Sequence, residues 1–409
     1  MRRSCQSLRH CVGRSMARGA LPALLVLAGL MGQPTAGAAE QSPPRAQEFA
    51  NGFPKDANFF PIGVWLQHPR NAAAYSAVGI NTYVGLWKAP SEEQLAQLEA
   101  HGLYVIAEPS KEARSLPNAH VIRAWLQADE PDNAQANGRG GYGDCILPEE
   151  VVRRYRVMQE FDRTRPVFLN FGQAVANPKW FGRGSKCSRI APEAYYRPAS
   201  RGADIVSFDI YPAAEERQGH VMGKLELVGQ GVANLRQWSQ PGQPVWAAIE
   251  TTHINHPSRR PLPHEVKSEV WMALIHGASG IFYFAHEWQP SFREDGLFRY
   301  PDIVREIARV NAQIGGLAPV LNSASLPNRV TVDAGVAIAT LVKHHGDATY
   351  VFAVNMENKP AKARLALSGI GGPYAVVLGE DRLIKLEGGA IGDEFDAYGV
   401  RLYKIPDKG

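Results

Sequence analysis

The chain is poor in cysteine, in long apolar runs and, beyond its first residues, in excess charge. Only two of its four cysteines, Cys145 and Cys187, follow the N-terminal leader described below. No CxxC or HExxH pattern is present, so we expect neither a metal site nor another cofactor. No later apolar run reaches the roughly 20 residues that cross a bilayer without a charge or a proline. We therefore expect no membrane span.

Residues 1–38 have the features of a secretory signal peptide. Five arginines and no acidic residue precede the apolar run 21–31, and small residues at 36–39 supply a cleavage site near Ala38. A start at Met16 would give a leader of more usual length. Either start predicts Sec-type export to the periplasm or the medium.

The expected mature chain is close to neutral, because 39 basic residues face 40 acidic ones once residues 1–38 are removed. Nucleic-acid binding needs a clustered basic surface, so no such partner is predicted. In an oxidising compartment, Cys145 and Cys187 are expected to form a disulfide.

Short apolar runs alternate with helical segments over residues 57–320, after a Pro-, Gln- and Ala-rich lead-in at 39–56 that we expect to be disordered. Continuous apolar runs are typical of parallel strands that are buried on both faces. Eight such units predict an α/β fold, a (β/α)8 TIM barrel, with a doubly wound open sheet as the alternative. The expected strands are 60–66, 80–86, 104–107, 121–128, 166–171, 205–211, 245–249 and 280–284.

Residues 328–407 have a different pattern, in which short strands show period-2 alternation and are separated by Gly-containing turns. This pattern predicts a small C-terminal antiparallel β-sandwich that braces the barrel. The expected strands are 329–333, 336–343, 349–355, 362–366, 375–378 and 399–404.

Two segments, RAWLQADEPD and PVWAAIETTH, place Glu130 and Glu250 at the carboxyl ends of expected strands four and seven. These ends form the active face of a TIM barrel. Burying a carboxylate there costs free energy unless the group is paired or used. Glycoside hydrolysis uses two carboxyl groups in different electrostatic settings. The alternatives are a capping or salt-bridged loop acid for Glu130 and an ion pair with an arginine such as Arg259 for Glu250.

This arrangement resembles clan A of the glycoside hydrolases, whose acid/base and nucleophile glutamates end strands four and seven of the barrel. The resemblance implies that Glu130 is the acid/base, that Glu250 is the nucleophile and that the anomeric configuration is retained. SFDIYP resembles the strand-six segment of the clan, which implies that Tyr211 steadies the nucleophile, and FYFAHEW implies that Trp288 lies beneath the reacting sugar. Many members have Asn where this chain has Asp129, so the identity of the sugar stays open.

Further polar and aromatic residues follow the expected strands and are candidates for sugar binding by stacking or hydrogen bonding. Besides Asp129, Tyr211 and Trp288 they are Trp65, His68, Trp87, Glu108, Asn170, Asp209, His253 and His286, with Trp180 as another stacking candidate. For the tryptophans, ordinary packing is the alternative.

The glycine-rich segment NGRGGYGDC at 137–145 lacks the GK[ST] ending of a phosphate loop and is predicted to be an insert after strand four. The disulfide would pin this insert over the site or act as a surface staple. Together these features predict an exported retaining glycoside hydrolase that acts on an oligo- or polysaccharide. The alternative is a non-catalytic carbohydrate-binding barrel in polysaccharide assembly or export.

Overall fold

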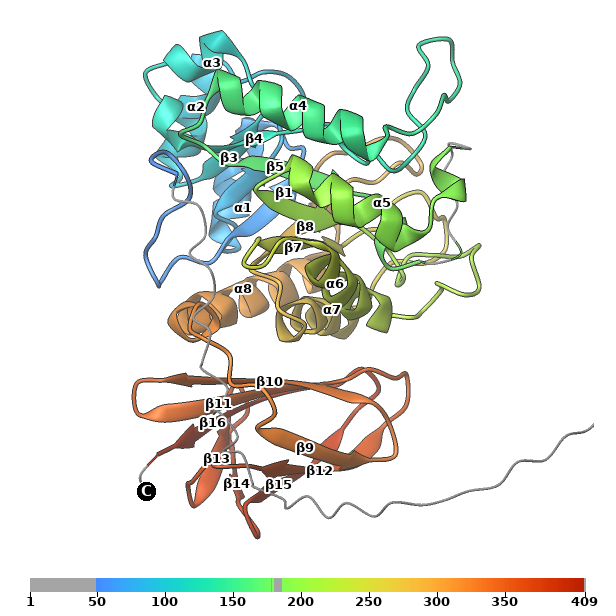
Figure 1. Ribbon diagram of the computed structural model, residues 1–409. Helices are drawn as coiled ribbons and strands as arrows, with labels where there is room; N and C mark the ends of the chain where they lie inside the picture. Colours follow the sequence, from blue (N-terminus) through green and yellow to red (C-terminus); the bar gives the residue numbers. More distant parts are fainter. Residues whose placement is uncertain (1–48, 178, 180–185, 408–409) are drawn as a thin grey trace, which may run out of the picture. The chain divides into compact units, whose positions relative to one another are not determined.

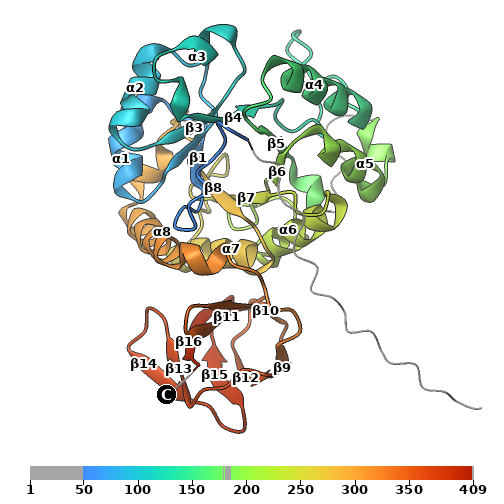
Figure 2. The ribbon, with the colours of Figure 1, turned by 60° about the vertical axis from the view of Figure 1, so that its left-hand side comes forward.

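The computed structural model describes residues 49–177, 179 and 186–407. The expected signal peptide, most of the lead-in and Trp180 lie outside these residues. Eight parallel strands close into a barrel in chain order, which confirms the TIM barrel and excludes the open sheet (Figures 1 and 2). The barrel strands are β1 (Ile62–Trp65), β2 (Thr82–Val84), β3 (Tyr104–Ala107), β4 (Ile122–Leu126), β5 (Val167–Phe171), β6 (Ile205–Phe208), β7 (Val245–Glu250) and β8 (Gly280–Phe284).

Helices surround the barrel, as Figure 2 shows from one end. They are α1 (Ala72–Ala77), α2 (Glu92–Ala100), α3 (Lys111–Ser115), α4 (Pro148–Phe161), α5 (Pro192–Ala199), α6 (Glu226–Trp238), α7 (Pro263–Ile275) and α8 (Pro301–Leu321). Single 3-10 turns lie at Pro69–Asn71, Ala119–Val121, Gln173–Val175, Cys187–Arg189, Ser200–Gly202 and Gly296–Arg299. Local sequence sets several helix starts: at α2, the hydroxyl of Ser91 and the side chain of Gln94 form a reciprocal capping box.

Large side chains fill the interior of the barrel. Trp246 of β7 lies edge-on to Phe168 of β5, with ring centroids 5.3 Å apart, and Trp65 of β1 lies 5.5 Å from Phe282 of β8. Alternate strand residues face the helices and join the larger apolar core. The interior is therefore packed, and chemistry is left to the loops at the strand ends.

Residues 49–56, the described part of the predicted disordered lead-in, pack against the barrel. The backbone N–H of Asn51 donates to the carbonyl of Thr164 at 2.8 Å. The ring of Phe53 lies 5.5 Å from that of Trp246 and 6.1 Å from that of Phe59. Phe53 and Phe59 are partly buried here and supply apolar contacts. The composition of the lead-in as a whole had predicted disorder instead.

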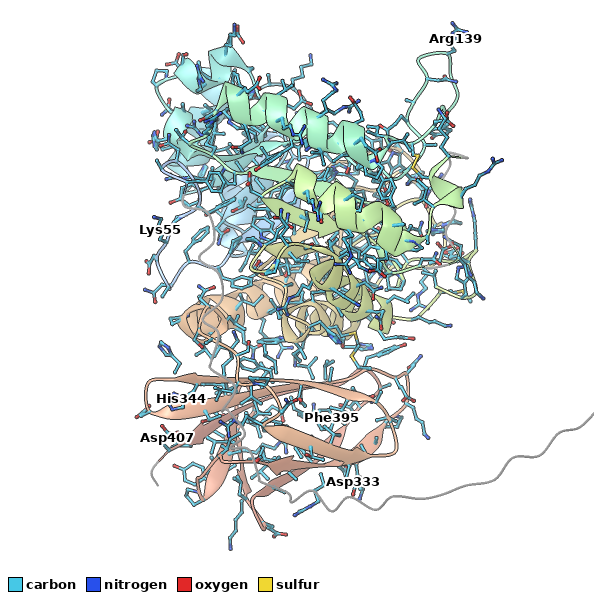
Figure 3. The ribbon with its side chains drawn as sticks, in the orientation of Figure 1. Lys55, Arg139, Asp333, His344, Phe395 and Asp407 are labelled. Atoms are coloured by element: carbon cyan, nitrogen blue, oxygen red, sulfur yellow. A yellow bond between two sulfur atoms is a disulfide. The ribbon has the colours of Figure 1, made fainter. Side chains whose placement is uncertain are left out.

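The C-terminal residues form two antiparallel sheets, in agreement with the predicted sandwich. One sheet has the order β10-β11-β16-β13-β14 and the other β15-β12-β9. The strands are β9 (Val330–Ala334), β10 (Ile338–His345), β11 (Ala348–Asn355), β12 (Ala361–Leu367), β13 (Tyr374–Val377), β14 (Arg382–Lys385), β15 (Ala390–Phe395) and β16 (Val400–Pro406). The sequence pattern missed β14 and β15, which are mostly polar on one face. Figure 3 labels His344 and Asp407, whose side chains pair at 2.9 Å in this domain.

Helix α7 packs against the sandwich and is buried along almost its whole length. The ring of Trp271 lies 5.3 Å from that of Phe352 in β11, and the hydroxyl of Ser268 donates to the carbonyl of Tyr398 at 2.7 Å. These contacts fit the bracing role expected of the sandwich. No helix in the described part of the chain is long and apolar enough to cross a membrane.

Candidate active site

Asn170, at the carboxyl end of β5, joins two carboxyl groups from the neighbouring strand ends. Its amide nitrogen donates to Asp129 Oδ1 at 3.0 Å and to Asp209 Oδ2 at 3.2 Å. Its amide oxygen accepts a hydrogen bond of 2.7 Å from the hydroxyl of Ser207, which fixes the direction of the amide. Asn170 is only 1% exposed. Its amide nitrogen therefore holds the two carboxyls together from a buried, fixed position.

Glu130 lies beside this pair with its backbone in the left-handed region, at φ 42°. Few residues other than glycine adopt this conformation, and each such case costs of order 1 kcal/mol. Hydrogen bonds hold it in place: its N–H donates to the carbonyl of Asn170 (2.9 Å), its Oε2 accepts from the Asn133 side chain (3.1 Å), and its carbonyl accepts from the Asn133 N–H (3.0 Å) and from Gln135 (2.9 Å). A strained backbone that its surroundings enforce is a feature of functional sites.

Asp132 is a buried support for the same loop. Its carboxyl accepts from the N–H of Gly172 at 2.9 Å and from the hydroxyl of Tyr196 at 2.7 Å. Desolvation and the negative charge of Glu130 raise the pKa of Asp132 to about 6. Gly172 leaves space for this arrangement, since a Cβ there would lie 2.9 Å from Glu130 Oε1.

The crowding of acids also shifts the pKa of the two carboxyls on Asn170. Asp129 remains exposed to solvent at the end of β4, yet desolvation by the surrounding protein atoms, together with the charge of Asp132, raises its pKa to about 6. Burial, followed by the charges of Glu130 and Asp129, raises the pKa of Asp209 well above its usual range. These carboxyls therefore bind protons at a higher pH than isolated carboxyls do.

Tyr211 borders the acid cluster. Its ring centroid lies 4.9 Å from that of Phe284. Its hydroxyl oxygen is buried and has no hydrogen-bond partner among the described residues. Burial raises the pKa of Tyr211, and the charges of Asp209, Glu130, Asp129 and Glu250 raise it further. The hydroxyl thus lies among carboxyls without being bonded to any of them.

Glu250, the expected nucleophile, is 0% exposed, and its charge also raises the pKa of Tyr211. Its two carboxyl oxygens accept hydrogen bonds from the N–H groups of Ala213 and Ala214 at 2.5 and 2.6 Å. Burial raises the pKa of Glu250 to about 7, and burial followed by the charge of Glu250 raises the pKa of Glu269 in α7 well above its usual range. The alternative partner, Arg259, pairs instead with Glu265 at 2.8 Å. The structure therefore holds the carboxyl of Glu250 on the backbone of the loop after β6.

An aromatic wall, defined here as Trp87, His286, Trp288 and Phe292, follows strands β2 and β8. His286 stacks on Trp87 with ring centroids 5.2 Å apart, and Phe292 lies 5.7 Å from Trp87 and 5.6 Å from Trp288. Trp87, Trp288 and Phe292 are 46%, 42% and 49% exposed. In the order of the barrel strands, this wall stands across the mouth from β4–β6 and the acid cluster.

Glu294 anchors this wall. It accepts from the indole nitrogen of Trp87 at 2.6 Å and from the backbone N–H of His68 at 3.1 Å, and it pairs with Arg70. Glu294 thus fixes the ring of Trp87, and Trp87, Trp288 and Phe292 remain partly exposed. Exposed rings held in this way form sites on which a sugar can stack.

The remaining predicted residues are placed as follows. Trp65 is 5% exposed and packs inside the barrel, and the ring of His68 caps the turn at Pro69–Asn71. Glu108 is exposed at the end of β3. His253 lies edge-on to Tyr300, with centroids 5.8 Å apart. The ring nitrogen of His286 bonds to the carbonyl of Leu66 at 2.9 Å, so this residue supports the wall.

Sequence reasoning missed Asp132, Gly172, Phe292, Glu294 and Glu269. Asp132 belongs to the quoted DEPD motif and was within reach of the same argument. Phe292 and Glu294 lie farther along the loop after β8 than His286 and Trp288, beyond the residues that directly follow the strand. Glu269 lies on a helix, and only the buried face of α7 could have indicated it. Within the described ranges, no group of three or more His, Cys, Asp and Glu side chains is placed to hold a metal ion.

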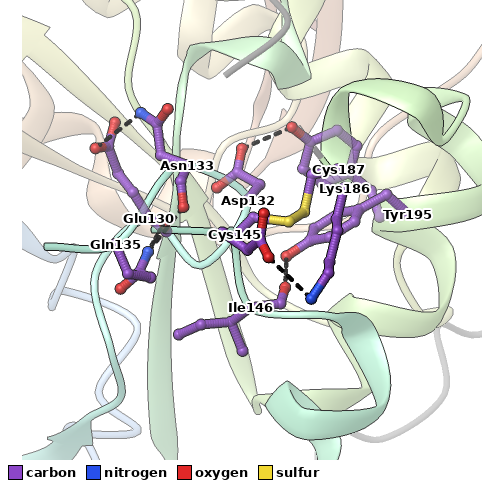
Figure 4. Close-up of a disulfide and its surroundings, with 11 residues drawn as sticks. Glu130, Asp132, Asn133, Gln135, Cys145, Ile146, Lys186, Cys187 and Tyr195 are labelled. Carbon is purple, nitrogen blue, oxygen red and sulfur yellow. Dashed lines mark hydrogen bonds and ion pairs between the residues drawn. A yellow bond between two sulfur atoms is a disulfide. The ribbon is translucent and has the colours of Figure 1, made fainter. Parts of the chain in front are cut away.

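The predicted disulfide between Cys145 and Cys187 is confirmed, with Cα atoms 6.0 Å apart (Figure 4). Both cysteines are buried next to the loop that carries Asp132 and Glu130. An ion pair of 2.8 Å between Lys186 and Asp144 lies beside it. The bridge therefore ties the end of the insert to the support of Glu130, while the tip of the insert, marked by Arg139 in Figure 3, remains exposed.

No protein-family model and no curated protein matches this chain. Solved structures share its fold. AmyP in complex with maltose matches at 11% identity and a TM-score of 0.52, over 86% of this chain and 97% of that one. A catalytic mutant of Gan42B, a GH42 beta-galactosidase from G. stearothermophilus, matches at 9% identity and a TM-score of 0.53, over 85% of this chain and 98% of that one. At these identities the likeness concerns the fold alone: a barrel and accessory domain that glycoside hydrolases also use.

Proposed function

We propose that the protein is a glycoside hydrolase that acts on an oligo- or polysaccharide at the mouth of the barrel. The observation that carries this proposal is the pairing of a cluster of carboxyls on β4–β6 with an exposed aromatic wall on β2 and β8. Sugar rings stack on aromatic faces, and carboxyls in unlike settings cleave glycosidic bonds. The fold shared with glycoside hydrolases supports the same class.

Glu130 keeps the acid/base role expected from its position after strand four, and its strained, hydrogen-bonded loop holds it in place. For the second carboxyl we propose Asp209, because Glu250 is fully buried and both of its oxygens are occupied by backbone donors. The positive charge that develops on the sugar in the transition state favours the ionised form of Asp209. Glu250 then supports the loop after β6.

This assignment keeps the retaining mechanism expected from the sequence. Asp209 would attack the anomeric carbon while Glu130 protonates the departing oxygen, and Glu130 would then take a proton from the water that releases the sugar. Since Asp209 must be ionised and its pKa is raised, activity should fall on the acidic side at a pH above the ordinary carboxyl range. A buried disulfide is consistent with the proposed export.

The test is product analysis by mass spectrometry with a panel of bacterial and plant glycans. Purified residues 39–409 would be compared with Glu130→Gln, Asp209→Asn and Glu250→Gln, and with Glu160→Gln as a matched surface control. We expect Glu130→Gln and Asp209→Asn to lower turnover at least 1,000-fold, on the order of the 4 kcal/mol that one group supplies to a transition state. Loss confined to Glu130→Gln and Glu250→Gln would return the nucleophile role to Glu250.

The anomeric form of the first product, followed by NMR, tests retention directly. The rival function is the non-catalytic carbohydrate-binding barrel. Saturable binding of a glycan, with no product from the same glycan at high protein concentration, would favour that rival.

A further inference from the structure

Asp129 and Asp209 are neighbouring carboxyls that form no ion pair with a basic side chain in the part of the chain that the structure describes. Each accepts a hydrogen bond from Asn170. The charges with the largest effect on the pKa of each group are acidic. For Asp209 these are the charges of Glu130, Asp129 and Asp132, all of the same sign.

Two carboxyls this close can be stabilised by a proton or by a cation. Desolvation and the charges of neighbouring acids raise the pKa of both groups, so protonation is favoured when no cation is bound. A cation supplied by a ligand would replace those protons with direct ion pairs in a partly desolvated site, where charge-assisted hydrogen bonds are strong. Asp129 is the member of the pair that remains open to solvent, so an incoming ligand can reach it.

Tyr211 supplies an independent indication of a ligand at this place. Its buried hydroxyl has no partner in the described structure, although a buried polar group normally has one. Its charged neighbours are Asp209, Glu130 and Asp129, together with Glu250. A ligand group between these carboxyls would also give the hydroxyl a partner.

We propose that the substrate carries a free amino group, and that the ammonium of an amino sugar binds between Asp129 and Asp209 beside the Tyr211 hydroxyl. This inference rests on the proposed function and names its substrate class. A compact ammonium with three N–H donors can reach Asp129, Asp209 and Tyr211 together. The aromatic wall across the mouth suits the same substrate, because ring faces attract both sugar C–H groups and cations.

Binding measurements on the Glu130→Gln protein separate recognition from cleavage. Calorimetry would compare glucosamine and galactosamine oligomers, in α and β linkages, with their N-acetylated counterparts at pH 7. We expect at least tenfold tighter binding of the free-amine form in one linkage. Adding Asp129→Asn should abolish this preference, whereas adding Glu160→Gln, which removes a surface carboxyl on α4, should leave it unchanged.

Salt and pH provide two more readouts. The preference should shrink between 50 and 500 mM salt, the range we would test, because charges are screened. It should also shrink from pH 7 to pH 5 as Asp129 becomes protonated, since its pKa lies at about 6. Equal binding of amine and N-acetyl forms in every linkage would overturn the inference.

The two proposals fail in different ways. If wild-type protein cleaves a neutral glycan and shows no preference for amines, hydrolysis stands and the amino-sugar assignment falls. If amine oligomers bind through Asp129 but are never cleaved, the assignment of the ligand stands and the hydrolase proposal falls.

Discussion

The pair formed by Glu250 and Glu269 predicts a dependence of stability on pH that does not rely on any substrate. Both side chains are 0% exposed, and burial, followed by the charge of Glu250, raises the pKa of Glu269 well above its usual range. Neither carboxyl oxygen of Glu269 has a hydrogen-bond partner within the described structure. Glu265 of the same helix also raises the pKa of both groups, and its carboxyl is held by Arg259. The perturbation we choose is Glu269→Gln, because an amide can donate to Glu250 without a proton.

The sign follows from the direction of the shift. Burial raises the pKa of Glu250 from 4.5 to about 7, so the folded state favours the protonated form. The resulting stabilisation is complete below about pH 4.5 and is lost as the pH rises through about 7, by on the order of 3 kcal/mol for this shift. With Glu269→Gln, Glu250 can ionise while it accepts from Ala213, Ala214 and the new amide, so this loss should largely disappear.

The assay is urea unfolding at intervals from pH 5 to pH 8. We expect the free energy of unfolding of the wild type to fall over this range and that of Glu269→Gln to stay nearly flat, so that the variant is the more stable protein at pH 8. Glu160→Gln should follow the wild type. A wild-type curve as flat as that of the variant would refute the raised pKa of Glu250 on which this prediction rests. Glu250→Gln should instead destabilise at every pH by about 1–3 kcal/mol, because its NH2 group faces the buried N–H of Ala213 or Ala214.

Three further predictions concern the site. Replacing Cys145 and Cys187 with alanine should lower the free energy of unfolding, relative to oxidised wild type, by up to about 4 kcal/mol for their separation of 42 residues. Reduced wild type is the control and should behave like the variant. Phe292→Ala should raise KM about tenfold with little change in kcat, because it removes a stacking face; a change confined to kcat would contradict this role. Gly172→Ala should lower kcat/KM at least tenfold with little loss of thermal stability, since its Cβ would lie 2.9 Å from Glu130 Oε1; unchanged turnover would show that Glu130 tolerates displacement.

Much of the architecture could be predicted from the sequence because its signals are periodic and redundant. Eight apolar runs with helical segments between them admit few folds, and each expected barrel strand overlaps an observed one. The disulfide followed from counting the cysteines outside the leader. Strands β14 and β15 escaped prediction because they carry charged residues such as Arg382 and Asp393, which pair with each other at 2.9 Å.

The candidate site was predictable only as far as strand ends determine it. Asp129, Asn170, Asp209 and Tyr211 were expected at the mouth and are found together there. Trp65 was expected at the rim and fills the barrel, since a tryptophan at the last position of β1 can point inward. The direction of a side chain at a strand end depends on the loops around it, and a single sequence does not contain that information.

Glu250 shows why this matters for function. Strand alternation places it on the same side of β7 as Trp246 and Ala248, which face the barrel interior, and that parity favours an active-site role. The N–H groups of Ala213 and Ala214 in the loop after β6 compete for its carboxyl, and Glu269 completes a buried site for it. Leaving this site would expose two buried donors at a cost of about 1–3 kcal/mol each. Unless a substrate offsets that cost, Glu250 stays bound to this loop, which is why we propose Glu130 and Asp209 as the reacting pair.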